Sequence, residues 1–304
     1  MLCGQTIEIL KAFMIAIADH ELMIEKQRQY LSRLEEFEPY ATFVRLDRNN
    51  NGFLSPNEIY NFMKDNEFNH VTIEDCQYLV QYFDSDVDGV LNYTDYMQWV
   101  ITCDDSYLRA AVTQRDPYGV NPDEYLAPIL ERELAILFEK EFAYHREISI
   151  IKRDLNDASD FTMENAFVEI DNEGLNIIDY ASVECFLKRN GFAPTDEELT
   201  AIIRRIDVSA DASCSYDEFE EALRPVILDN YNGISSNSEP RLANPSKVKL
   251  ENIRNGLFSH MVTEENPYEY EKSPAKNIPS SNHKKYNPEE IPISKSYYEK
   301  KHLD

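Results

Sequence analysis

The sequence predicts an all-α fold built from two pairs of helix-loop-helix units, each pair preceded by a long amphipathic helix. Short acidic segments alternate with helical patterns, long stretches lack glycine and proline, and the whole arrangement occurs twice along the chain. The expected organisation is a long helix (1–36), a first pair (37–103), a linker (104–122), a second long helix (123–157), a degenerate second pair (158–227) and an extended or disordered tail (228–304).

The two long helices are predicted from apolar residues spaced three and four apart. In the first helix, Glu21 and Arg28 interrupt the apolar stripe, so we expect part of it to be open to solvent. In the second helix, Glu141 is the polar interruption, and His145 is expected on a charged helix face. The linker between the two halves is polar and contains prolines and a glycine, so we expect an irregular connector there.

The clearest motif is the twelve-residue segment 47–58, DRNNNGFLSPNE, which we call loop 1. Gly52 at position 6 permits the sharp bend that the backbone needs there. Oxygen ligands at positions 1, 3, 5, 7, 9 and 12 come from Asp47, Asn49, Asn51, Phe53 (through its carbonyl), Ser55 and Glu58. Calcium prefers six to eight oxygens, with a bidentate carboxylate at the last position. Loop 1 is therefore the predicted main calcium site.

Loop 2 (84–95, DSDVDGVLNYTD) repeats this pattern. Its expected ligands are Asp84, Asp86, Asp88, Val90 (through its carbonyl), Asn92 and Asp95. The aspartate at position 12 is one methylene shorter than the usual glutamate, which makes bidentate binding harder and favours weaker calcium or magnesium binding. Four carboxylates converging without a cation would repel one another, so we expect a metal to occupy this loop.

The two loops of the second half have changed to different degrees. Loop 3 (171–182, DNEGLNIIDYAS) keeps Asp171 but has Leu175 at position 5 and Ser182 at position 12, so we expect no tight metal site. Loop 4 (207–218, DVSADASCSYDE) departs mainly at Ala212, where glycine is usual, and its metal binding is expected to be weakened. The candidate ligands of loop 4 are Asp207, Ser209, Asp211, Ser213, Ser215 and Glu218.

Composition narrows the classes of function. Acidic residues outnumber basic ones by 56 to 30, giving a net charge of −26, and the excess lies before residue 228. A nucleic acid or an anionic membrane is therefore not expected as a partner, whereas cations and basic protein segments are favoured. Five scattered cysteines without a CxxC motif indicate reduced thiols in the cytoplasm. Phosphate-binding glycine loops, nucleophile elbows and zinc motifs are lacking, so an enzyme is not expected.

From residue 228 onward the composition changes to prolines, balanced charge and scattered tyrosines, without an apolar period. Such a composition predicts an extended or disordered segment. Two interpretations stay open. Aromatic residues among prolines suit docking along the surface of a partner, whereas a plain solvated linker would have the same composition.

The paired loops resemble the calmodulin, troponin C and centrin superfamily of EF-hand proteins over about residues 37–103 and 161–225. The resemblance is strong at loops 1 and 2 and moderate at loop 4. The long helices and the tail depart from those small sensors. This arrangement looks like that of ciliate EF-hand proteins, and so do the segments FEPYATFVRLDRN, YLVQYFDSDVDG and ELTAIIRRID. Members of that group are associated with ciliary axonemes and doublet microtubules.

This second resemblance implies a calcium-binding structural or regulatory component of a cytoskeletal assembly, with tubulin or axonemal proteins as partners and the cilium as location. The alternative is a soluble calmodulin-like sensor, or a regulatory subunit, that binds target helices in a groove opened by calcium. Promiscuous grooves of that kind are rich in methionine, whereas this chain has seven methionines in 304 residues. The methionine content, the degenerate second pair and the long tail favour the structural interpretation.

Overall fold

The structure, a computed structural model, describes residues 2–121, 124–171 and 173–225. Its first half contains α1 (Gly4–Arg33), α2 (Pro39–Leu46), α3 (Pro56–Asp65), α4 (Ile73–Phe83), α5 (Tyr93–Val100) and α6 (Ser106–Thr113). The second half contains α7 (Pro128–Asp157), α8 (Met163–Ile170), β1 (Ile177–Ile178), α9 (Tyr180–Arg189), α10 (Asp196–Ile206), β2 (Cys214–Ser215) and α11 (Tyr216–Leu223). The fold is mostly helical, as the sequence predicts, and the expectations for the tail concern residues outside the described ranges.

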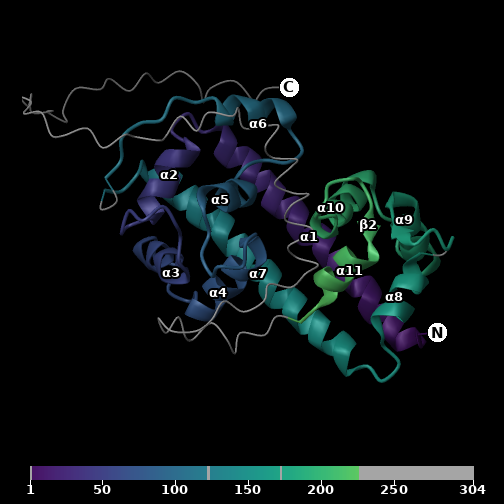
Figure 1. Ribbon diagram of the computed structural model, residues 1–304. Helices are drawn as coiled ribbons and strands as arrows, with labels where there is room; N and C mark the ends of the chain where they lie inside the picture. Colours follow the sequence, from purple (N-terminus) through teal and green to yellow (C-terminus); the bar gives the residue numbers. More distant parts are fainter. Residues whose placement is uncertain (1, 122–123, 172, 226–304) are drawn as a thin grey trace, which may run out of the picture. The chain divides into compact units, whose positions relative to one another are not determined.

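The long helices α1 and α7 pack against each other along much of their length, and α10 packs against α1 (Figure 1). Pro128 stands at the first turn of α7, where its missing N–H costs no hydrogen bond, so the second long helix begins there. In the predicted linker the structure differs from the sequence-based expectation of an irregular connector. Residues 106–113 form α6, because the Asp105 side chain caps the helix at the Leu108 N–H and Val112 is buried.

In each half, two loops are joined by a short antiparallel contact at their eighth positions. Leu54 and Leu91 exchange backbone hydrogen bonds with N–O distances of 2.8 and 2.9 Å. In the second half, β1 and β2 pair in the same way, with Ile178 opposite Cys214. All four of these side chains are fully buried, so each contact fixes two loops against a common core. The internal duplication seen in the sequence is thus a duplication of structure.

The core of the first half lies where its helices meet α7. The Trp99 ring on α5 stacks on Phe138 of α7 with ring centroids 3.8 Å apart, and Phe62 of α3 lies 5.4 Å from the same phenyl ring. All three side chains are completely buried. Aromatic groups of this size dominate core energetics. The apolar face of the first helix-loop-helix pair is therefore covered by a helix of the second half of the chain.

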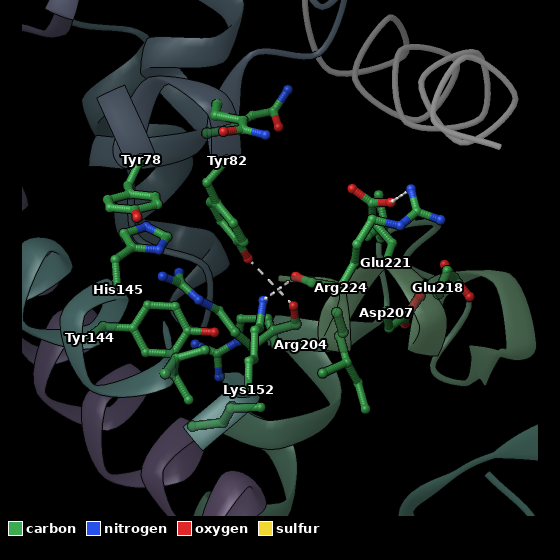
Figure 2. A pocket seen from close by; sticks show the side chains of 18 of the residues that line it. Tyr78, Tyr82, Tyr144, His145, Lys152, Arg204, Asp207, Glu218, Glu221 and Arg224 are labelled. Carbon is green, nitrogen blue, oxygen red and sulfur yellow. Dashed lines mark hydrogen bonds and ion pairs between the residues drawn. The ribbon is translucent and has the colours of Figure 1, made fainter. Parts of the chain in front are cut away.

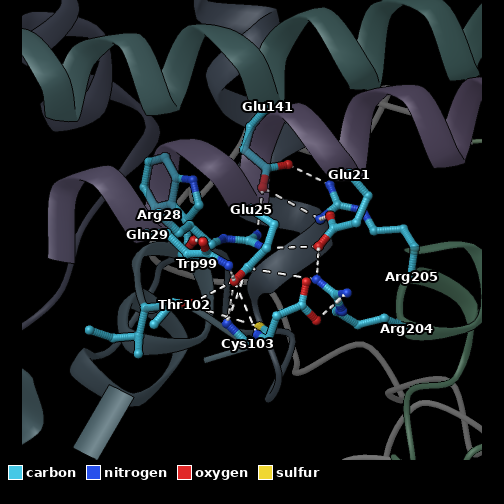
Figure 3. A network of polar contacts seen from close by, with 12 residues as sticks. Glu21, Glu25, Arg28, Gln29, Trp99, Thr102, Cys103, Glu141, Arg204 and Arg205 are labelled. Atoms are coloured by element: carbon cyan, nitrogen blue, oxygen red, sulfur yellow. Dashed lines mark hydrogen bonds and ion pairs between the residues drawn. The ribbon is translucent and has the colours of Figure 1, made fainter. Parts of the chain in front are cut away.

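The polar interruptions of the long helices are buried, contrary to the expectation of an open stripe. Glu21 and Glu141 are fully buried, and the exposed fraction of Arg28 is 2%. The Arg28 guanidinium donates to Glu21 at 3.0 Å and to Glu141 at 2.9 Å, and its Nε donates to the Trp99 carbonyl at 2.8 Å (Figure 3). His145 is also buried, so its assignment to a charged face was wrong. These charges lie inside because partners on other helices compensate them.

We call this group of Glu21, Glu25, Arg28, Glu141, Arg204 and Arg205 the buried ion cluster. It joins α1, α7 and α10, because Arg205 donates to both Glu21 and Glu141. Burial alone would raise the pKa of Glu25, but hydrogen bonds from Thr102 and from the backbone N–H groups of 103 and 104, with the Arg28 charge, lower it. The cluster thereby contacts the segment that follows α5 as well as the end of α10.

None of the helices in the described part of the chain is long and apolar enough to cross a membrane.

Candidate metal sites

The four loops share one backbone arrangement around the aspartate at position 1. Its carboxylate accepts hydrogen bonds from the N–H groups at positions 5 and 6. The N–O distances are 3.1 and 2.7 Å for Asp47, 3.3 and 2.8 Å for Asp84, 3.0 and 2.8 Å for Asp171, and 3.3 and 2.8 Å for Asp207. Each loop is thus folded around its first carboxylate. In a loop of this shape, the side chains at alternate positions face the place where a metal ion would bind.

In loop 1, predicted metal ligands contact one another around the Glu58 carboxylate. Asp47 and Glu58 are almost completely buried, with exposed fractions of 3% and 6%. One Glu58 oxygen accepts from Asn49 Nδ2 at 2.9 Å, and the other accepts from the Ser55 hydroxyl at 2.7 Å. Asn51 Oδ1 accepts from the Phe53 N–H at 2.9 Å. The side chains at positions 3, 9 and 12 are therefore held in mutual contact, as ligands of one calcium ion would have to be.

Loop 2 contains a group of three carboxylates that lie close enough to hold one metal ion. Asp84, Asp86 and Asp88 each offer a carboxylate oxygen, and these three atoms lie within 4.8 Å of one another. Burial raises the pKa of Asp88, and the neighbouring carboxylate of Asp86 adds to this shift. Burial also raises the pKa of Asp95, at position 12. A divalent cation would remove the repulsion that causes part of these shifts, so the arrangement fits metal binding.

The residue at position 12 reaches differently in the three loops. Glu58 and Glu218 each contact position 3, Glu58 through the Asn49 side chain and Glu218 through the Ser209 N–H at 2.7 Å. Asp95 contacts the hydroxyl of Ser85, at position 2, at 2.6 Å. The shorter side chain thus makes a different contact across its loop. This agrees with the expectation of weaker calcium binding at loop 2, which stays a prediction.

In loop 4, Ala212 has a φ of 68° in the region that favours glycine, and Ala210 has a φ of 57°. The left-handed conformation costs a residue with a Cβ about 1–2 kcal/mol. Burial raises the pKa of Asp207, and the Glu218 carboxylate adds to that shift. The ligand pattern is nevertheless arranged as in loop 1. The departure from glycine therefore strains the folded backbone without displacing the metal-binding residues.

We expect that Ala212→Gly raises the stability of the folded protein by about 0.5–1 kcal/mol, because glycine adopts a positive φ without a steric penalty. Calcium affinity at loop 4 should change less than about twofold, since the backbone conformation is already the one that the loop needs. Chemical denaturation and calorimetry would measure the two quantities. The matched control, Ala143→Gly inside α7, should lower stability by about the same amount. Equal effects of both substitutions would contradict the strain at Ala212.

Loop 3 has the backbone arrangement without the ligands. Asn176 takes the positive φ at position 6, with a value of 59°, which asparagine tolerates well. Leu175 at position 5 is exposed and offers no side-chain oxygen, and the Ser182 hydroxyl donates to Asp179 at 2.9 Å. The loop thus retains its shape as the partner of loop 4 through β1 and β2. The absence of a tight metal site in loop 3 stays a prediction.

Sequence reasoning missed the connection between the loops and the buried ion cluster. Arg204 and Arg205 stand immediately before loop 4, and Thr102 and Asp104 follow the helix that leaves loop 2. The available signal was the alternation of opposite charges on the apolar stripe of the first helix, at Glu21 and Arg28. A pattern of that kind indicates partners elsewhere in the chain, but it does not identify them.

A comparison with protein-family models matches the EF-hand domain pair at residues 39–101 and again at 160–224. No curated protein matches. The two matched segments contain all four loops, and the matched family binds Ca²⁺ through oxygen ligands of the kind described above. The family match thus agrees with the helical pairs and the paired loops. Each half of the chain therefore carries a segment that matches the EF-hand domain pair, a domain of the kind that binds Ca²⁺.

Proposed function

We propose that this protein is a non-enzymatic, calcium-binding structural component of a protein assembly, in which calcium stabilises a largely preformed arrangement. The observation that carries the proposal is the packing of the first EF-hand pair against α7. Phe138 of α7 contacts both Trp99 and Phe62, all fully buried. In a sensor, a target helix from another protein would need such an apolar face. Here the chain's own helix covers it.

Polar contacts between the halves support the same role. Arg146 of α7 donates two hydrogen bonds to Asp75 of α4, at 2.8 and 2.7 Å. Arg45 of α2 donates to Glu131 of α7 at 2.8 Å, and the exposed fraction of Arg45 is 1%. Separating the partners of a bidentate or a buried ion pair costs more free energy than separating those of an exposed pair. Opening the groove of the first pair would break these contacts together with the aromatic ones.

The second candidate function is a calcium sensor that releases α7 and then binds a target helix. One observation favours it. The indole Nε1 of Trp99 is buried without a hydrogen-bond partner among the described residues. An unsatisfied buried donor lowers the cost of moving the ring away from α7, because water would supply the missing acceptor.

Fluorescence of the single tryptophan separates the two functions. For a structural role, we expect calcium to raise the melting temperature while the emission maximum stays at the short wavelengths of a buried indole. The physical reason is that Trp99 belongs to α5, which leaves loop 2, and stays stacked on Phe138. A shift of the emission to that of a water-exposed indole on calcium addition would support the sensor and contradict the structural role. Glu74→Gln, an exposed change outside the loops, serves as the control.

We propose further that the assembly is cytoskeletal, with tubulin or ciliary axonemal proteins as partners. Support for this step is the sequence resemblance to ciliate axonemal EF-hand proteins, together with the acidic charge that favours basic protein segments. We expect the full-length protein to stay in the salt-washed cytoskeletal fraction of ciliated cells. Recovery of nearly all of the protein in a soluble extract, with or without calcium, would exclude this location.

A further inference from the structure

A cavity of about 400 Å³ lies between α4 and α7 of one side and α10 and α11 of the other (Figure 2). Its wall includes Tyr82, Tyr144, His145 and Lys152, together with Arg205 from the buried ion cluster. A volume of this size is within the range of small-molecule sites, and such sites combine apolar walls with a few placed polar groups. The cavity differs from the contact of Trp99 and Phe62 with Phe138, because none of these three residues lines it and residues of α10 and α11 form part of its wall.

Several buried polar groups that line this cavity have no hydrogen-bond partner among the described residues. These are His145 Nε2, Arg205 Nε and both amide atoms of Gln98. Each of the three side chains is at least nine-tenths buried, with an exposed fraction of 8%. A buried polar atom without a partner costs free energy, so clusters of such atoms around one cavity call for an occupant. Three of these atoms are nitrogens that can donate a hydrogen bond: His145 Nε2, Arg205 Nε and Gln98 Nε2.

Lys152 adds a positive charge to the wall of the cavity, beside Arg205. Lys152 Nζ donates to the Arg224 carbonyl at 3.3 Å, and no carboxylate of the described residues forms an ion pair with it. Burial lowers the pKa of Lys152 to about 8, with the Glu221 carboxylate opposing this shift and Arg205 adding to it. Burial, followed by the charges of Arg205 and Lys152, holds the pKa of His145 well below its ordinary value. The imidazole is therefore neutral, and one tautomer presents an N–H at Nε2.

Aromatic rings surround these donors. The Arg205 guanidinium lies 4.7 Å from the ring centroid of Tyr82 and 4.2 Å from that of Tyr144. The His145 ring lies 5.0 Å from Tyr82 in an edge-on arrangement. Ile148 adds an aliphatic surface on α7. A ligand here would meet aromatic and aliphatic side chains together with the nitrogen donors of Arg205, His145 and Lys152.

We propose that this cavity binds a small organic anion with an aromatic or aliphatic body. Its acidic group pairs with Lys152 and accepts hydrogen bonds from Arg205 Nε and His145 Nε2. Its body packs against Tyr82 and Tyr144. The inference goes beyond calcium binding, because no residue that carries it is a candidate metal ligand. Four carboxylates also line the cavity. Glu221 is paired with Arg224 at 2.9 Å, whereas Asp84, Asp207 and Glu218 belong to loops 2 and 4, so binding is measured with calcium present to compensate their charge.

The test uses 2-naphthoate as the anionic probe and 2-naphthamide as its uncharged match, with the full-length protein and isothermal titration calorimetry. We expect saturable binding of one 2-naphthoate per chain, and binding of the amide at least about tenfold weaker, because a charge-assisted contact is lost. Lys152→Met should weaken 2-naphthoate binding about tenfold or more. The matched control, Arg153→Met, alters an exposed neighbour on the same helix and should leave binding unchanged.

A second variant keeps the test decisive if circular dichroism shows that the Lys152→Met protein does not fold. Ser149→Phe places a ring in the cavity from the partly buried Ser149, and it should abolish binding of both probes. Absence of saturable 2-naphthoate binding to the unaltered protein would overturn the proposal. So would equal affinity for the anionic and neutral probes, or binding that survives Ser149→Phe. Because none of these variants touches a loop, calcium titration of each reports separately on the proposed function.

Discussion

Replacing Glu141 by leucine is expected to destabilise the folded protein by about 3–5 kcal/mol, the range for removing one partner of a buried ion pair. Glu141 is fully buried and accepts from Arg28 at 2.9 Å and from Arg205. The leucine side chain accepts no hydrogen bond, so both guanidinium groups lose a partner inside the core. Neither can neutralise itself by losing a proton at ordinary pH. Denaturation by urea, followed by circular dichroism, measures the loss.

An exposed residue of the same helix provides the control, and a second member of the cluster tests the coupling. Asp154→Leu removes an exposed carboxylate from the same helix and should change stability by about 0.5 kcal/mol or less. Arg205→Met alone should also be strongly destabilising. The double change with Glu141→Leu should cost less than the sum of the two single changes, because both remove the same interaction. Additive losses, or a loss below about 1 kcal/mol for Glu141→Leu, would contradict a buried and coupled cluster.

Glu58→Gln is expected to weaken calcium binding at loop 1 about tenfold or more. The change removes one negative charge and the bidentate carboxylate at position 12, while its length is unchanged. The amide can still accept from the Ser55 N–H, which the Glu58 carboxylate does at 2.9 Å, so α3 should keep its cap. Isothermal titration calorimetry with calcium should show the loss of one tight site with the other sites retained.

Glu74→Gln is the matched control, because this exposed glutamate lies in the first turn of α4, between the two loops of the first pair. It should leave stoichiometry and affinities as they are. Unchanged calcium binding in Glu58→Gln would show that loop 1 is not the main calcium site. A uniform weakening at every site would instead indicate that the first pair had been disturbed as a whole, which the melting temperature would show.

The sequence by itself predicted the helical class, the four loops and their pairing, because these depend on local rules. Position 1 aspartates accept from the backbone N–H groups of their own loops, and the glycine at position 6 of loop 1 has a φ of 85°. Capping follows the same local logic: Ser55 and Glu58 form a capping box within four residues. The family match to two EF-hand domain pairs agrees with these predictions. The metal ligands themselves stay predictions until a metal is measured.

Only the tertiary structure decided where the charges on the long helices lie. In the sequence, Glu21 and Arg28 are interruptions of an apolar stripe. In the structure, Arg28 pairs with Glu141 and Glu21 pairs with Arg205, both far along the chain. His145 likewise reads as a surface residue until α4 and α10 are packed around it. The physical reason is that the cost of burying a charge depends on what compensates it. Spacing within one helix determines which residues share a face, whereas compensation depends on residues that only the folded chain brings together.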